Sequence, residues 1–461
     1  MSRPDLVIVS NRGPLSFSIG DDGHAVARRG GGGLVSTLGP VVAGARATWV
    51  AAAITDADRQ ASGAGVVEAE GFRLRSLAIE AEAYRQFYDV IANSTLWFMH
   101  HHLFDLARRP HIDHRWRTSW SAFVDVNRTF AEAVADEAAD GATVVVHDYQ
   151  LPLVGAGLAE LRPDLRTCHF HHTPFADPDA LAVLPDDVAA TLVAGMAAHG
   201  ACGFHSARWA RSFEASCRAV LGRVPTTFVS PAAVGVDDLR AVATGEECRA
   251  EAETLRELVG DRRVIVRVDR IEPSKNVLRG FRAFEELLVV RPEWRERVVF
   301  HACIYPSRET LPDYLAYRAE VETLVARINT TWSTPDWTPI LLDTSDVFAR
   351  SLAALGCYDV LLVNPVRDGL NLVALEGSVI NRTDGVLVLS REAGVFDQLG
   401  EDALAVNPFD IAATAEALHQ ALTMDGSERS ARAGRLRSTA ERRRPREWLA
   451  DQVDHARAPS V

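Results

Sequence analysis

Residues 364–376 have the types and spacing needed to bind an anionic sugar derivative. They follow an apolar run at 360–363, form a turn with proline and glycine, and enter a helical pattern near Asn371. The unpaired N–H groups and positive dipole end of a helix N-terminus suit a diphosphate. Asp368 before the helix and Glu376 inside it could accept hydrogen bonds from sugar and ribose hydroxyls. The segment therefore indicates a site for a sugar joined to a nucleoside diphosphate, although the same local arrangement also occurs without a ligand.

Two basic side chains follow another strand-like run, at 264–268. Arg270 and Lys275 lie at the expected carboxyl edge of a sheet. Cations placed there can stabilise the charge that develops on a departing diphosphate. The alternative is that they form only a surface ion-pair cluster with Glu272.

A run of four glycines, Gly30 to Gly33, precedes a helical pattern from Leu34. Glycine lets the backbone approach a ligand without a Cβ in the way, and N–H groups before a helix can bind phosphate. Arg28 and Arg29 beside the run favour its interpretation as an anion-binding site. A hairpin tip is the alternative interpretation.

Histidines follow two further strand-like runs, where Asp148 comes after His147 and where His169 begins a segment ending in His172. We expect these side chains to reach the same cleft as the basic ones. His172 could then hydrogen-bond a sugar hydroxyl, or the histidines could be structural hydrogen-bonding groups. The segment lacks the i, i+4 spacing and companion carboxylate of common zinc motifs, so no metal is expected.

Aromatic and basic side chains elsewhere could complete a sugar-phosphate pocket. The faces of Tyr88 and Trp97 could pack against a sugar ring, although such residues more often belong to a core. Arg12 and Arg308 each lie on a loop after a strand-like run, in different halves of the chain. The paired N–H groups of an arginine can hold a phosphate.

Length and composition restrict the class of protein. A chain of 461 residues is too long for one core and predicts two large domains. A net charge of -13 argues against a nucleic-acid partner. The N-terminus has no signal-peptide pattern and no apolar run approaches a membrane span, so a cytoplasmic location is expected. The six cysteines include no CxxC pair and are expected to be reduced thiols.

Strand-like and helical runs alternate through most of the chain, which predicts an α/β fold with parallel sheets. Two Rossmann-like halves are expected, at 1–236 and 237–461, with ligands at the carboxyl ends of the strands in a cleft between them. The segment 229–236 is strand-like, and 442–444 is expected to be a solvated helix face. Strands are expected at 6–10, 48–53, 143–147, 167–171, 264–268, 297–302, 340–342, 358–363, 385–389 and 404–406, and helices at 116–139, 185–199 and 248–259.

Taken together and in order, these motifs resemble those of the trehalose-6-phosphate synthase family, the retaining glycosyltransferases of family 20, and most closely its actinobacterial members. The resemblance extends from residue 10 to about residue 425. It implies a GT-B fold, in which two Rossmann-like domains with parallel sheets face each other across a cleft. It also implies that the first domain binds the acceptor, that the second binds the nucleotide sugar, and that a last helix at about 440–456 returns to the first domain. The motifs that carry it are 88–97, 147–149, 172–175, 269–275, 367–376 and 389–394.

The resemblance also implies a role for each matching residue. For the donor it implies that the diphosphate is bound by Arg270, Lys275 and the backbone at Gly32 and Gly33, the glucose by Asp368, His172 and the backbone at Leu370, Asn371 and Leu372, and the ribose by Glu376. For the acceptor it implies a sugar-phosphate pocket formed by Arg12, Tyr88, Trp97, Asp148 and Arg308. Arg270, Lys275, Asp368 and His172 would be the catalytic set. Neither a metal nor another cofactor is implied.

The expected reaction is transfer of glucose from UDP- or GDP-glucose to glucose 6-phosphate, which gives α,α-trehalose 6-phosphate with retained configuration. One alternative is another phosphorylated acceptor, such as glycerol 3-phosphate or an aminocyclitol phosphate. A non-catalytic nucleotide-sugar sensor is the other. The expected partners are small-molecule substrates, without nucleic acid or membrane, and a homo-oligomer is left open.

Several positions depart from the family pattern. Ala52 stands where a second tryptophan lines the acceptor side, and Asn276 replaces a usual glycine. Gln150 and Leu375 stand where histidine and lysine are usual, and the Leu-Asp-Tyr of the family is replaced at 271–273. These changes leave the diphosphate-binding cations in place. They do not determine which nucleotide base the donor carries or which acceptor is used.

Overall fold

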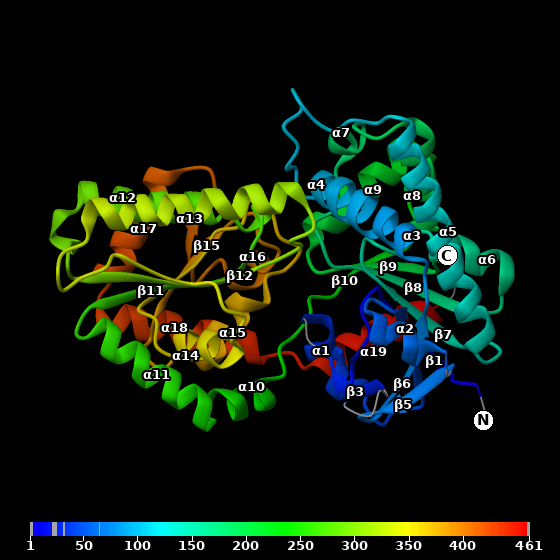
Figure 1. Cartoon of the computed structure of the whole chain (residues 1–461), viewed down its shortest axis with the longest axis horizontal. Helices are drawn as coiled ribbons and strands as arrows, with labels where there is room; N and C mark the ends of the chain where they lie inside the picture. The colour runs from blue at the N-terminus through cyan, green and yellow to red at the C-terminus, as the bar shows by residue number, and fades with distance from the viewer. Residues whose placement is uncertain (1–2, 21–24, 31–32, 64, 459–461) are drawn as a thin grey trace. The chain divides into compact units, whose positions relative to one another are not determined.

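The computed structural model describes residues 3–20, 25–30, 33–63 and 65–458, and they form two compact units (Figure 1). The first unit consists of the chain up to Ala232 together with the segment from Pro445. The second unit is Ala233–Arg444. The division therefore falls four residues before the expected boundary at 236. The last helix, α19 (Pro445–Arg457), belongs to the first unit.

The first unit is built on an eight-stranded sheet that is parallel except at the β5 edge. Its central strands are buried along their length, because both faces of the sheet are covered. A separate antiparallel pair precedes the first helix, and neither this pair nor the β5, β6 and β9 strands were anticipated. In sheet order the strands are β10 (Thr227–Val229), β9 (Ala201–Phe204), β8 (Arg166–His171), β7 (Thr143–His147), β1 (Leu6–Val9), β4 (Ala47–Ala52), β6 (Phe72–Leu77) and β5 (Val66–Ala69), and the separate pair is β2 (Leu15–Ile19) and β3 (Ala25–Arg29).

The longest helix of the first unit, α5, begins after Asp113, whose side chain accepts a hydrogen bond from the backbone N–H of Trp116. Its buried aromatic face includes Trp120 and Phe123, and it packs against the π-helix η1. The helices are α1 (Gly33–Val42), α2 (Asp56–Ser62), α3 (Ala81–Arg85), η1 (Gln86–Leu96), α4 (Trp97–His100), α5 (His114–Glu137), α6 (Val154–Leu161), α7 (Pro178–Leu181), α8 (Asp186–Ala197), α9 (Ala207–Leu221) and α19.

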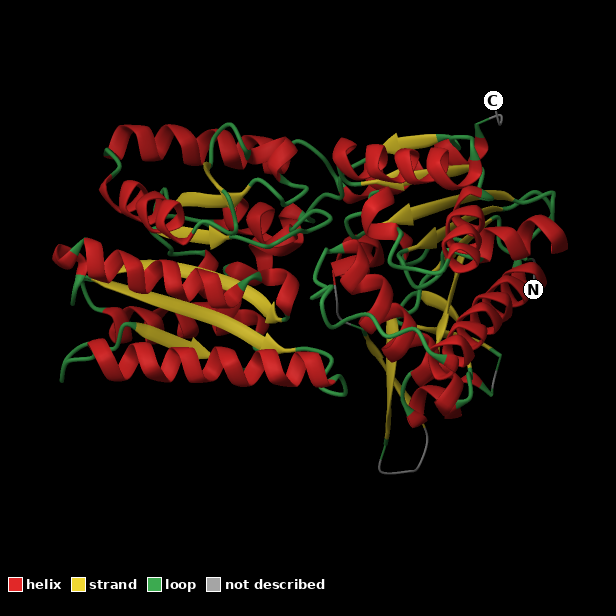
Figure 2. Ribbon diagram, turned by 90° about the horizontal axis from the view of Figure 1, so that it is seen from above, coloured by secondary structure: helices red, strands yellow, loops and turns green. Residues whose placement is uncertain are grey.

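The second unit is built on a six-stranded sheet in which all neighbours are parallel. Apolar side chains of α12, α13 and α17 cover one face, and α11, α14, α15 and α18 lie on the other (Figures 1 and 2). In sheet order the strands are β13 (Ile340–Asp343), β12 (Val298–Pro306), β11 (Arg263–Ile271), β14 (Val360–Val363), β15 (Val386–Ser390) and β16 (Leu404–Val406). The helices are α10 (Val236–Ala243), α11 (Glu246–Val259), η2 (Pro273–Lys275), α12 (Val277–Val290), η3 (Pro292–Trp294), α13 (Pro312–Trp332), α14 (Phe348–Leu355), α15 (Leu372–Ile380), α16 (Phe396–Leu399), α17 (Ile411–Thr423) and α18 (Gly426–Glu441).

The alternating strands and helices expected in each half are confirmed, but two local interpretations are wrong. Residues 230–235 are not a strand: β10 ends at Val229 and α10 begins at Val236. Residues 442–444 are not a helix face either, because α18 ends at Glu441 and Pro445 disfavours a helical conformation of the residue before it. Among the described residues, no helix is both long enough and apolar enough to cross a membrane.

Candidate functional site

The second unit positions Lys275 through a buried arginine in the strand before it. Arg267 is fully buried, and its Nη2 donates to the backbone oxygen of Lys275 at 2.7 Å and to Asn364 Oδ1 at 3.0 Å. Its Nε donates to Asp269 Oδ2 at 2.9 Å, so the buried charge is paired. A Cβ at Gly280 would lie 2.4 Å from Arg267 Nη1, which explains a glycine in that helix. Arg267 thus holds the turn that carries Lys275.

Lys275 contacts Asp368 directly. Its Nζ donates to Asp368 Oδ2 at 2.5 Å, and both side chains are mostly buried. Burial lowers the pKa of Lys275, but the carboxylates of Asp368 and Asp269 outweigh that effect and the pKa is raised overall. Lys275 is therefore charged at neutral pH. The structure brings together two residues expected at one site although they lie 93 positions apart.

The turn that carries Asp368 is held against a neighbouring loop. Asp368 N–H donates to Glu392 O at 3.2 Å, and Val395 N–H donates to Leu370 O at 2.8 Å. A Cβ at Gly394 would lie 1.9 Å from Gly369 O, so only glycine allows this approach. The position of Asp368 therefore depends on the loops after β14 and β15 together.

Asn371 caps helix α15, which begins at Leu372 as expected. Its backbone has a positive φ of 85°, and its side-chain oxygen accepts from Ala374 N–H at 3.2 Å. The side-chain amide donates to Asp368 Oδ2 at 3.2 Å. The helix N-terminus, Asp368 and Lys275 thus form one polar group at the carboxyl edge of the sheet.

Glu376 lies one turn into α15 and is half-buried. Burial raises the pKa of its carboxyl group to about 7. No hydrogen bond or ion pair joins it to another of the described residues. A carboxylate held this way has unused acceptor capacity, which fits the hydroxyl-binding role inferred for it.

Arg270 and Arg308 share one buried carboxylate. Arg270 Nη2 lies 3.2 Å from Glu272 Oε1, and Arg308 Nη1 lies 3.2 Å from Glu272 Oε2. Arg308 Nη1 also donates to Tyr314 Oη at 2.5 Å. The predicted pairing of Arg270 with Glu272 is thus present, but Glu272 is fully buried and the cluster is not a surface one.

Asp148 and His172 meet in the first unit at the ends of β7 and β8. Asp148 adopts a positive φ of 76°, and its Oδ1 accepts from the N–H groups of Tyr149 at 2.9 Å and His172 at 3.3 Å. Sequence reasoning expected both residues to reach one cleft, and the structure places the Asp148 carboxylate in contact with the His172 backbone.

The ring of His172 belongs to a row of three imidazoles. Ala232 N–H donates to His205 Nδ1 at 3.2 Å, so His205 carries its proton on Nε2, which lies 3.2 Å from His172 Nδ1. His172 Nε2 in turn lies 3.1 Å from His147 Nδ1. Burial lowers the pKa of His172 to about 3, so the ring is neutral. Both ring nitrogens are engaged, which favours the structural interpretation over a hydrogen bond from the ring to a sugar hydroxyl.

The residues expected around an acceptor phosphate in the first unit differ in exposure. Arg12 is exposed, on the loop after β1. Tyr88 is half-buried and stacks on Tyr84, with ring centroids 5.5 Å apart. Trp97 is 6% exposed and its ring stacks on that of His101, with centroids 4.1 Å apart, so most of the side chain is packed in the core.

Of the two glycines expected to help bind the diphosphate, Gly32 lies outside the described residues. Gly33 is exposed and is the first residue of α1.

The departures from the family pattern have structural consequences. Asn276 has a positive φ of 59°, which asparagine tolerates better than most residues, and its side chain donates to Asn364 O and Pro408 O. Ala52, Gln150 and Leu375 are each buried, so none of them presents a long side chain to solvent.

Sequence reasoning missed several residues that position the site, namely Arg267, Tyr314, His205 and Trp448. Only Arg267 had a usable signal, because a charged residue inside an apolar strand requires a buried partner. Glu272 was considered only as a surface partner.

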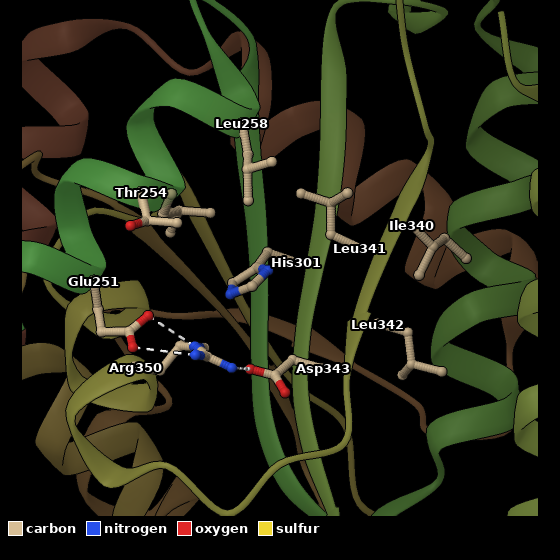
Figure 3. A pocket seen from close by; sticks show the side chains of 10 residues that line it. Glu251, Thr254, Leu258, His301, Ile340, Leu341, Leu342, Asp343 and Arg350 are labelled. Atoms are coloured by element: carbon tan, nitrogen blue, oxygen red, sulfur yellow. Dashed lines mark hydrogen bonds and ion pairs between the residues drawn. The ribbon is translucent and has the colours of Figure 1, made fainter.

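A cavity of about 440 Å³ in the second unit contains none of the predicted site residues (Figure 3). It is lined by α11, β12, β13 and α14. Arg350 lies at one end between Glu251 and Asp343, donating to Glu251 at 2.8 and 3.1 Å and to Asp343 at 2.6 Å. Arg350 is thus paired with two carboxylates, and no residue predicted to bind phosphate lines this cavity. Among the described residues, no cluster of histidine, cysteine and carboxylate side chains could hold a metal ion.

The profile of glycosyltransferase family 20 matches residues 4–458. The chain belongs to this family. It is a glycosyltransferase with a GT-B fold. It is 33% identical to a trehalose-6-phosphate synthase of Mycobacterium sp. (strain JLS), over 98% of this chain and 94% of the relative.

Solved structures of family members agree over the same length. An α,α-trehalose-phosphate synthase (UDP-forming) from Burkholderia vietnamiensis is 28% identical, with a TM-score of 0.84 and coverage of 98% of this chain and 99% of that one. A Burkholderia xenovorans enzyme of the same description, in complex with glucose-6-phosphate, is 27% identical, with a TM-score of 0.85 and coverage of 98% and 100%.

Proposed function

We propose that this glycosyltransferase moves glucose from UDP- or GDP-glucose to glucose 6-phosphate and forms α,α-trehalose 6-phosphate with retained configuration. The observation that carries the proposal is the array of Arg270, Lys275, Asp368 and the α15 N-terminus at one sheet edge. Family members described as trehalose-phosphate synthases, one of them in complex with glucose-6-phosphate, support the choice of product and acceptor. We expect the protein to act on both substrates in the cytoplasm.

Arg270 and Lys275 would bind the donor diphosphate and stabilise the charge that develops as the C1–O bond to phosphate breaks. Asp368 would hold the donor glucose while the acceptor hydroxyl attacks C1 from the same face. The hydroxyl proton would pass to the departing phosphate oxygen, so no protein nucleophile is required. Catalysis would rest on positioning and electrostatic stabilisation.

The positive charge at the proposed diphosphate site comes from side chains, and we propose that no metal takes part. Activity is therefore expected to persist in excess chelator. The measurement is the rate with EDTA, compared with the rate after adding magnesium or manganese. Complete loss in EDTA that either cation restores would contradict the proposal.

A different phosphorylated acceptor is the second candidate, and Ala52 favours it. Ala52 stands where the family pattern has a tryptophan that lines the acceptor side, and the smaller side chain would leave more room there for a bulkier molecule. The deciding experiment supplies UDP- and GDP-glucose separately, with glucose 6-phosphate, glycerol 3-phosphate, an aminocyclitol phosphate and plain glucose as acceptors, and identifies products by mass spectrometry. Trehalose 6-phosphate as the main product supports the proposal. Equal use of plain glucose, or no transfer to any acceptor, would overturn it.

A further inference from the structure

Glu272 is a single carboxylate held between two arginines that were expected to serve different substrates. It is fully buried, and each of its oxygens lies 3.2 Å from one guanidinium. Ser274 Oγ donates to Glu272 Oε1 at 3.4 Å. Tyr314 anchors Arg308 from the other side, with a hydrogen bond of 2.5 Å and its ring centroid 5.3 Å from the guanidinium carbon.

Two guanidinium groups flank the one carboxylate. Each of them forms an ion pair with Glu272, which compensates the cost of burying its charge. The side chain of Arg308 is 8% exposed and that of Arg270 is 37% exposed, so Arg270 in particular can contact a ligand. Glu272 also raises the pKa of Arg270.

We propose that Glu272 is a positioning residue that holds Arg270 for the donor diphosphate and Arg308 for the acceptor phosphate, so that its loss impairs binding of both substrates. The proposal rests on the proposed function for the identity of the two phosphates. The position of each guanidinium depends on the same carboxylate, because both groups lie 3.2 Å from an oxygen of Glu272.

The test substitution is Glu272→Gln, which keeps the size of the side chain. The amide has one oxygen and one NH₂ group, so it can accept from one guanidinium while its N–H groups face the other. The KM values for donor and acceptor are each expected to rise on the order of tenfold, the effect of losing one charge-assisted hydrogen bond. In an Arg308→Ala background, Glu272→Gln should no longer affect the acceptor KM but should still raise the donor KM.

Glu251→Gln is the matched control. Glu251 also pairs with an arginine in the second unit, Arg350, in the cavity that contains none of the predicted site residues (Figure 3). This variant is expected to leave both KM values unchanged. Equal KM changes in both glutamine variants, or an undiminished effect of Glu272→Gln on the acceptor KM in the Arg308→Ala background, would overturn the inference.

Binding measurements separate this inference from the proposed function. UDP and glucose 6-phosphate are titrated by calorimetry into the wild-type protein and into the Glu272→Gln variant. Weaker binding of both ligands to the variant supports the inference even if the wild type transfers glucose to no acceptor, a result that would overturn only the proposed function. Unchanged binding of either ligand would overturn the inference, whatever the wild type catalyses.

Discussion

At the scale of single residues, the proposed chemistry depends on cations that the fold keeps charged and in place. Lys275 is held by Asp368 through its side chain and by Arg267 through its backbone. Arg270 is held by Glu272. Residue types alone predicted these cations, but their carboxylate partners explain why the charges can be maintained in partly buried surroundings.

Replacing either cation should reduce turnover more than stability. Arg270→Ala and Lys275→Ala are each expected to lower kcat by ~10²–10³, the usual cost of removing one group that stabilises transition-state charge. The measurements are kcat with UDP- and GDP-glucose, and the melting temperature. Lys275→Ala also removes the ion pair with Asp368, so Lys275→Arg is the control that keeps the charge. Near-normal kcat in both alanine variants would show that the cations are only structural.

Glu376 should make donor binding depend on pH. With a pKa of about 7 in the free protein, its carboxyl group is protonated in half of the molecules near neutrality. The ionised form accepts ribose hydroxyl bonds better, so the donor KM is expected to fall as pH rises from 6 to 8. The measurement is the donor KM across that range. Glu376→Gln has no group that titrates there and should flatten the profile, and an equal slope in that variant would exclude Glu376 as the cause.

At the scale of elements, the last helix stabilises the first unit from the far end of the chain. Trp448 of α19 is fully buried, and its Nε1 donates to Ser230 O at 3.0 Å. Its ring lies 5.7 Å from that of His172 and 6.0 Å from that of His205. Asp451 accepts a hydrogen bond from Ser230 Oγ at 3.0 Å. The helix therefore encloses the histidine row.

Removing the anchor of α19 should destabilise the first unit. Trp448→Ala is expected to lower the free energy of unfolding by ~3–5 kcal/mol, because it leaves a large cavity and removes the hydrogen bond to the Ser230 carbonyl. The measurement is urea denaturation, with Trp448→Phe as a milder variant that keeps most of the volume. A loss below 1 kcal/mol would mean that α19 contributes little to the stability of this unit.

At the scale of the whole molecule, the two units differ in their content of buried histidine. Burial lowers the pKa of six histidines in the first unit, namely His100, His147, His169, His171, His172 and His199. In the described part of the second unit, only His301 shows the same effect, with its pKa lowered to about 4. The first unit should therefore be the more sensitive to acid.

The sign of this effect follows from proton binding. A histidine with a lowered folded pKa stays neutral in the fold, while the unfolded chain takes up a proton below its ordinary pKa of about 6.5. The contribution of these histidines to stability is thus complete above about pH 6.5, and it falls as the pH drops from there towards 3 or 4. Each such histidine lowers the free energy of unfolding by up to about 1.4 kcal/mol for each pH unit in that window.

Calorimetric scans from pH 7.5 to pH 5 should show the transition of the first unit moving to lower temperature by more than that of the second. The Trp448→Ala variant identifies the first-unit transition, because only that transition should shift in it. Equal shifts of the two transitions with pH would contradict the assignment to buried histidines.

By itself the sequence determined the α/β alternation, the cations and carboxylates near each strand end, and the start of α15. These features follow from local patterns: runs of apolar residues, turns and caps that span only a few positions. Missed strands such as β5 and β6 are only four and six residues long and include charged residues, so their local pattern is weak.

Only the tertiary structure decided which groups share a partner. Glu272 joins arginines 38 positions apart in a buried cluster, Lys275 meets Asp368 across 93 positions, and His172 takes its tautomer from His205 and Ala232. The raised pKa of Glu376 has the same origin, because burial depends on every element packed around a residue. Contacts between distant positions set desolvation and hydrogen-bond partners, and no local pattern encodes them.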